Sequence, residues 1–129
     1  MTTLMAAMTL ASTEVVSLLL ECGVNVERVD VMGNDAFMLA SVTGRSENVK
    51  YWLDRFKEYD LERENFVLGA TSLIISTTFG SNKIDTVRTL CSRGAHANAL
   101  THAGLSVSVY MFENIVSVFT TVDLWSDCI

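Results

Sequence analysis

Three residues between positions 85 and 96 are of the types that nucleophilic catalysis requires. Asp85, Cys91 and His96 could supply an orienting acid, a thiol nucleophile and a base. However, Asp85 and Cys91 lie six positions apart in a segment with helical periodicity, and Cys91 falls on the apolar side of that helix. We therefore interpret the grouping as accidental and predict that the chain is not an enzyme.

Cys91, His96 and His102 are also the residue types that bind zinc. Their spacings match none of the usual zinc-binding patterns. The sequence contains neither G-x-x-x-x-G-K-[ST] nor G-x-G-x-x-G, so a phosphate-binding loop has no support. We expect no metal site and no cofactor.

The elements that would position these residues recur along the chain. The blocks that open with Gly33 and Gly69 each close on a second glycine eleven positions later, and Gly104 continues the series. The opening glycines are 36 and 35 residues apart. A period of this length indicates stacked supersecondary units, which often present a binding surface to another macromolecule.

Each unit also contains a predicted amphipathic helix that begins on an acidic residue, which suits the positive end of the helix dipole: Glu14, Glu47 or Asp85. We expect three apolar sets at helical spacing to be buried, namely Val15, Leu18 and Leu19, then Val49, Trp52 and Leu53, then Val87, Leu90 and Cys91. Gly23 and Gly94 follow two of these helices, where a left-handed residue is common. Phe56 replaces this glycine in the middle unit, so that helix should end differently or run longer.

These residues resemble the ankyrin repeat, whose unit of about 33 residues is a β-turn followed by two antiparallel helices. The similarity is clearest for the second helix and the turn after it, at residues 14–25. The T-P-L-H-x-A signature of the first helix is degenerate in the segments that begin at Thr2, Asp35 and Thr71. The residues that replace the signature histidine should fill the core instead: Met5, Met38 and Ile74.

The resemblance implies an all-α fold, an ankyrin-repeat solenoid of stacked helix–turn–helix units joined by β-hairpin-like fingers. We assign residues 1–106 to this domain, as a partial first unit, two full units and the start of a fourth. Residues 107–129 form an apolar, irregular tail outside the repeat pattern. The abrupt start and the apolar tail favour a piece of a longer array.

Composition narrows the class of partner and the location. The net charge is −6 and no Lys/Arg cluster occurs, which disfavours nucleic acid. No uncharged apolar run is long enough to cross a membrane, and the N-terminus lacks a secretory signal. Three widely spaced cysteines do not make a disulfide framework. We expect a cytoplasmic or nuclear protein that is not secreted, with self-association through exposed apolar ends because 50% of the residues are hydrophobic.

By resemblance, fingers at residues 27–34, 60–68 and 99–103 and the faces of the first helices form a concave surface that binds another protein. The second finger mixes aromatic and charged residues, as interfaces do; the alternative is a solvated loop whose charges keep it soluble. The expected contact residues are Glu27, Arg28, Asp30, Met32, Tyr59, Asp60, Glu62, Arg63, Glu64, Phe66, Leu100, Thr101 and His102. We interpret the chain as a protein-interaction scaffold; the alternatives are a truncated repeat fragment and a regulatory segment of a larger protein, neither with independent activity.

Overall fold

A computed structural model describes residues 1–78 and 84–104 of the chain. These residues form six α-helices and no strand. The predicted all-α class is therefore confirmed for the described part, whereas the predicted tail at 107–129 lies outside it. The helices are α1 (Thr3–Leu10), α2 (Thr13–Glu21), α3 (Ala36–Thr43), α4 (Ser46–Arg55), α5 (Ser72–Thr78) and α6 (Ile84–Ser92).

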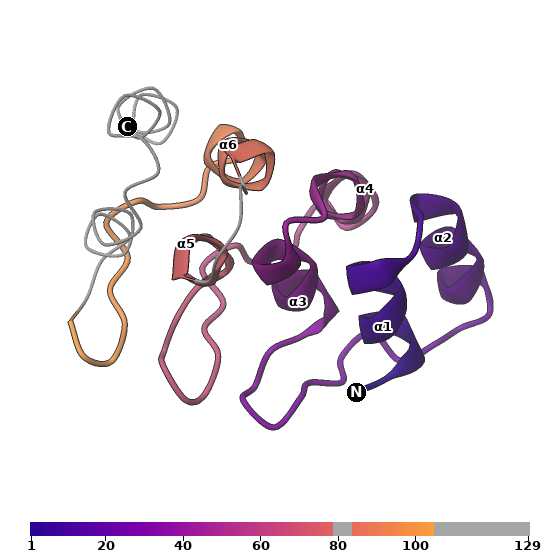
Figure 1. Ribbon diagram of the computed structural model, residues 1–129, viewed down its shortest axis with the longest axis horizontal. Helices are drawn as coiled ribbons and strands as arrows, with labels where there is room; N and C mark the ends of the chain where they lie inside the picture. Colours follow the sequence, from indigo (N-terminus) through magenta and orange to yellow (C-terminus); the bar gives the residue numbers. More distant parts are fainter. Residues whose placement is uncertain (79–83, 105–129) are drawn as a thin grey trace.

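The helices are arranged as three consecutive pairs in two layers. Helices α1, α3 and α5 pack side by side in one layer, and α2, α4 and α6 pack in the other (Figure 1). Each helix also packs against its partner in the pair, α1 on α2, α3 on α4 and α5 on α6. The core lies between the layers and between successive pairs, and contacts join neighbouring pairs along the row.

The first helix of each pair begins in the same way. The side chains of Thr2, Asp35 and Thr71 each accept a hydrogen bond from the backbone N–H three residues later, at 3.1, 2.8 and 3.4 Å. Such side-chain caps satisfy N–H groups that have no partner inside the helix. The predicted core residues that follow, Met5, Met38 and Ile74, are fully buried.

Each second helix begins one residue before the predicted acid, so Glu14, Glu47 and Asp85 lie in the first turns. Gly23 and Gly94 have φ angles of +80° and +96°, as expected for a glycine after a helix end. Helix α4 ends at Phe56 with φ −110° instead, and its 10 residues exceed the 9 of α2 and of α6. The predicted departure at Phe56 is therefore confirmed.

The predicted buried sets are confirmed in α4 and α6 and wrong in α2. Val15 and Leu18 are 43% and 60% exposed, and Leu19 is only partly buried, whereas Val16 and Leu20 face the core. Val49, Trp52 and Leu53 are buried, and so are Val87, Leu90 and Cys91. Helix α2 lies at one end of the row, and none of the other described helix pairs covers its outer side.

The two described cysteines are in different states. Cys91 is disulfide-bonded, whereas Cys22 is a free, exposed thiol. Over residues 1–78 and 84–104, none of the helices has both the length and the apolar character needed to cross a bilayer.

Candidate functional site

Three long loops project from the same side of the helices, next to the first-helix layer (Figure 1). We define the first loop as residues 22–35, the second as 56–71 and the third as 93–104. They contain the three predicted fingers. Their folding decides which of the predicted contact residues face solvent.

The first loop closes as a short hairpin. The N–H of Asp30 donates to the carbonyl of Asn34 at 2.9 Å, and the N–H of Gly33 donates to the carbonyl of Asp30 at 3.0 Å. The Asp30 carboxylate accepts from the N–H groups of Met32 and Asn34 at 3.0 and 2.8 Å. This pattern is that of a three-residue hairpin with glycine in the left-handed position.

The second loop repeats this closure with one additional residue at its tip. The N–H of Asn65 donates to the carbonyl of Ala70 at 3.0 Å. The Asn65 side-chain oxygen accepts from the N–H groups of Leu68 and Ala70 at 3.2 and 3.1 Å. Asn65 therefore has the role of Asp30. Asp30 and Asn65 are 35 residues apart, and the additional tip residue explains why Gly33 and Gly69 are 36 residues apart.

Backbone hydrogen bonds join successive loops into a row. The N–H of Phe66 donates to the carbonyl of Met32, and the N–H of His102 donates to the carbonyl of Leu68, both at 2.8 Å. Asn65 also donates from its amide to the side-chain oxygen of Asn34 at 3.0 Å. The three loop tips are therefore fixed relative to one another.

Aromatic rings cover two of the loop glycines. A Cβ on Gly33 would lie 2.5 Å from the ring of Phe66, and a Cβ on Gly69 would overlap the ring of His102. Both glycines also have positive φ angles, +83° and +64°. Any other residue would therefore be strained and would push the ring of the next loop away.

The row exposes only some of the predicted contact residues. Glu27, Arg28, Asp60, Glu64, Phe66, Leu100 and His102 are exposed. The others have structural roles or are largely covered: Asp30 and Met32 belong to the hairpin contacts, Tyr59 and Arg63 contact Asp35, and Thr101 is buried. Glu62 accepts a hydrogen bond from the N–H of His96 at 2.8 Å, which links the second and third loops.

Sequence reasoning missed two exposed apolar residues on the same loops. Val31 is 97% exposed and Val67 is 57% exposed, beside Phe66 at 68% and Leu100 at 54%. Side chains of this kind are usually buried, and four exposed examples lie on three loops that are hydrogen-bonded in a row; we call these four residues the apolar row. The signal in the sequence was an apolar residue at the tip of a predicted turn.

A buried carboxylate ties the second loop to helix α3. The Asp35 carboxylate, which caps α3, accepts a hydrogen bond from the Tyr59 hydroxyl at 2.6 Å and pairs with the Arg63 guanidinium at 3.1 Å. Asp35 is 1% exposed. Desolvation by burial, together with the neighbouring carboxylate, raises the pKa of Tyr59 far above its usual value near 10.

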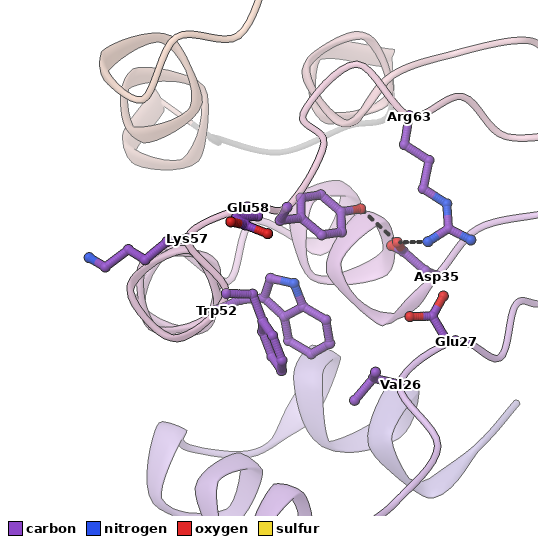
Figure 2. Close-up of a pocket in the computed structure, with 9 residues that line it drawn as sticks. Val26, Glu27, Asp35, Trp52, Lys57, Glu58 and Arg63 are labelled. Carbon is purple, nitrogen blue, oxygen red and sulfur yellow. Dashed lines mark hydrogen bonds and ion pairs between the residues drawn. The ribbon is translucent and has the colours of Figure 1, made fainter.

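A pocket of about 340 Å³ lies beside this cluster. Its lining combines aromatic rings with charged groups: Val26, Glu27, Asp35, Trp52, Phe56, Lys57, Glu58, Tyr59 and Arg63. Figure 2 shows Asp35 and Arg63 on one side of it, while Lys57 points away on the other. Trp52 packs against Phe56 with ring centroids 4.6 Å apart, so the aromatic rings contact each other rather than enclosing a separate binding cage.

The residues first considered for chemistry do not assemble into a site. Cys91 is buried and disulfide-bonded, so its sulfur is not available as a thiolate nucleophile. His96 is exposed, with its Nδ1 atom 3.9 Å from Glu62. No group of three or more His, Cys, Asp or Glu side chains that could hold a metal occurs among the described residues.

Comparison with known proteins does not assign the chain to a family. No family model matches the chain, and no curated protein shows significant sequence similarity to it.

Proposed function

We propose that this chain is a divergent ankyrin-repeat module that acts as a protein-interaction scaffold. The proposal is supported by helix pairs whose first helices begin 33 and 36 residues apart, by equivalent caps at Thr2, Asp35 and Thr71, and by loops that project on one side. Repeat stacks of this kind present extended surfaces and bind other proteins with them.

The single observation that carries the proposal is the apolar row on the loops. Val31, Phe66, Val67 and Leu100 are exposed on loops whose backbones are hydrogen-bonded to one another. Burial of such side chains against a partner would release free energy in proportion to the apolar area removed from water. Since the loops are already held together, little conformational freedom remains to be lost on binding.

The charges around this row indicate which kind of protein would fit. On the three loops the exposed acids are Glu27, Glu58, Asp60 and Glu64, and the exposed bases are Arg28, Lys57 and Arg93. Lys57 and Arg93 pair with Asp54 on helix α4, which leaves the acids in excess. Helices α1, α3 and α5 contain no charged residue at all. A partner with apolar residues flanked by Lys or Arg would be complementary to this surface, whereas a nucleic acid would be repelled.

Site-specific photo-crosslinking tests the proposed surface. A photo-reactive amino acid is placed at Val67 or Leu100 on the loops and, as the matched control, at the exposed Lys50 on helix α4. We expect a crosslinked partner from the loop positions and none from position 50, and we expect excess unlabelled protein to abolish the crosslink. Equal crosslinking from position 50 would contradict the proposal.

A second candidate function is that of a segment packed against another part of a longer protein. It is favoured by the exposure of Val15 and Leu18 on the outer side of α2, where the corresponding positions of the next pair, Asn48 and Tyr51, are more covered. Crosslinking from position 18 but not from position 100 would favour this candidate over the loop surface.

We further propose a cytosolic or nuclear location. The support is the exposed free thiol of Cys22 and the lack of an N-x-S/T sequence. In such a reducing compartment the Cys91 disulfide would be opened. Alkylation of Cys91 in fresh cell extract under denaturing, non-reducing conditions, followed by mass spectrometry, tests this location; a Cys91 that stays fully protected in the unfolded chain would count against it.

A further inference from the structure

The contact that joins two neighbouring loops occurs twice, and the same chemical groups form it each time. Phe66 and His102 each donate a backbone N–H to a carbonyl of the preceding loop, at 2.8 Å. Each also lays its ring over the glycine that follows that carbonyl, Gly33 or Gly69. The contact therefore needs a donor residue on one loop and, on the other, a carbonyl followed by a residue without Cβ.

Val31 occupies the same place on the first loop. It directly follows Asp30, just as Phe66 follows Asn65 and His102 follows Thr101. The N–H of Gly104 donates to the carbonyl of Thr101 at 2.9 Å, which matches the bond from Gly33 to Asp30. The three donor residues are therefore equivalent, although the intervals between them differ by one residue.

Unlike Phe66 and His102, Val31 has no loop beside it in the part of the chain that the structure describes. Its N–H has no hydrogen-bond acceptor there, and the residue is 97% exposed. The donor edge of the first loop is therefore open, with an apolar side chain and a backbone donor presented together.

We propose that this open edge binds a glycine-bearing turn of a partner protein. The partner would supply a carbonyl for the N–H of Val31 and a glycine beneath its side chain, so the bound turn would continue the contact that joins the three loops. The inference rests on the proposed function and specifies how one end of the loop surface recognises its partner. The exposed charges of this loop, Glu27 and Arg28, offset each other. The backbone hydrogen bond and the shape of the turn therefore decide which partner turn binds.

The probe is a cyclised synthetic peptide with the sequence of residues 60–70, which carries the carbonyl of Leu68 and Gly69. It is titrated into the full ¹⁵N-labelled chain. We expect saturable shifts of the Val31 amide and its neighbours at millimolar peptide. A peptide with valine in place of Gly69 should bind at least tenfold more weakly, because its side chain would occupy the space that Val31 needs.

Two variants at Val31 and one control variant complete the test. Val31 is the second residue of the Asp30–Gly33 turn, where proline is well tolerated, so Val31→Pro removes the donor and should abolish binding without opening the hairpin. Val31→Ser keeps the N–H and should bind several-fold more weakly. Lys50→Gln, on the exposed side of helix α4, should bind as the unaltered chain does.

Three results would overturn the proposal. These are equal binding by Val31→Pro, equal binding of the two peptides, and shifts confined to other loops. If the Val31 amide shifts with protein concentration in the absence of peptide, the occupant is a second copy of the chain instead. Loop crosslinks without peptide binding would remove this inference and leave the proposed function standing. If Val31→Pro does not fold, Val31→Ser and the peptide pair still decide.

Discussion

Single residues on the loops combine two constraints that can be separated by mutation. Gly33 has a positive φ and also lies under the Phe66 ring, whereas Gly94 has a positive φ and no atom near the position of a Cβ. A substitution at Gly94 therefore reports the backbone cost alone. The same substitution at Gly33 adds a steric cost that belongs to the contact between loops.

We expect Gly94→Ala to lower the free energy of unfolding by about 1–2 kcal/mol and Gly33→Ala by about 2–4 kcal/mol. Urea denaturation followed by circular dichroism measures both. Phe66→Ala in the Gly33→Ala background should recover part of the difference, because the ring no longer meets the new methyl group. Equal losses for the two glycines would show that the ring moves aside without cost.

The Tyr59 hydroxyl makes stability depend on alkaline pH. Burial and the neighbouring Asp35 raise its pKa in the folded state, so above pH about 10 the unfolded chain loses this proton more readily than the folded chain does. The stability that the protonated hydroxyl contributes is therefore present at neutral pH and lost as the pH rises. The slope approaches about 1.4 kcal/mol per pH unit for one group.

Tyr59→Phe removes this group and tests the slope. At pH 7 we expect the free energy of unfolding to fall by about 1 kcal/mol, because the variant lacks the hydrogen bond to Asp35. Between pH 9 and 11 its stability should decrease less steeply than that of the unaltered chain. Urea midpoints at several pH values supply the measurement, and Tyr51→Phe is the matched control. Parallel curves for Tyr59→Phe and the unaltered chain would contradict the assignment.

Among the helices, α1 depends on a side chain from the following pair for its C-terminal end. The Asn48 amide donates to the carbonyls of Met8 and Ala11, both at 2.9 Å, and Asn48 is fully buried. Thr86 occupies the corresponding position in α6, also fully buried, but its hydroxyl has no hydrogen-bond partner within residues 1–78 and 84–104. The two positions are therefore equivalent in sequence and different in energetic role.

We expect Asn48→Ala to destabilise the protein by about 1–3 kcal/mol, because the buried carbonyl of Met8 loses its side-chain donor, whereas the carbonyl of Ala11 keeps its hydrogen bond from Arg45. Thr86→Val removes an unsatisfied hydroxyl at nearly constant volume and should leave stability unchanged or raise it by roughly 1 kcal/mol. Thermal unfolding of the two variants provides the comparison. A loss at position 86 as large as that at position 48 would mean that shape, rather than hydrogen bonding, governs both.

Sequence patterns located the helices better than they oriented them. The acids, glycines and apolar spacing of α4 and α6 predicted their start and their buried faces. In α2 the adjacent pair Val15–Val16 and the run Leu18–Leu20 fit two registers one residue apart. Only the packing of α2 against its neighbours selects Val16 and Leu20, and periodicity within a single helix cannot supply that choice.

The sequence predicted where the candidate surface lies along the chain, but not which of its residues face solvent. Turn chemistry located the loops, but the cluster of Asp35, Tyr59 and Arg63 joins residues 24 and 28 positions apart. No local pattern reports such a pairing, so Tyr59 and Arg63 were predicted as contact residues although they stabilise the loop. The exposure of Val31 depends on the position of the first loop in the row, which a single unit of the sequence does not contain.

At the scale of the whole molecule, the exposed outer side of α2 should promote association. Residues 1–27 include three acids and no Lys or Arg, so repulsion weakens at low pH or high salt while the apolar contact remains. We expect sedimentation velocity to show concentration-dependent association that increases with salt. Leu18→Lys should abolish it, because a charged residue would have to be buried, and Lys50→Gln should not. Association unchanged in Leu18→Lys would assign the contact to another surface.

The arrangement of the described helices as a row of pairs has a mechanical consequence. Because the main contacts among these helices lie within a pair or between adjacent pairs, a force applied along the row would load these contacts one after another. Extension would peel one pair from the row at a time, each step releasing the length of one helical hairpin and its loop. The molecule would thus yield gradually under tension, like a short spring, and could close again as the load falls.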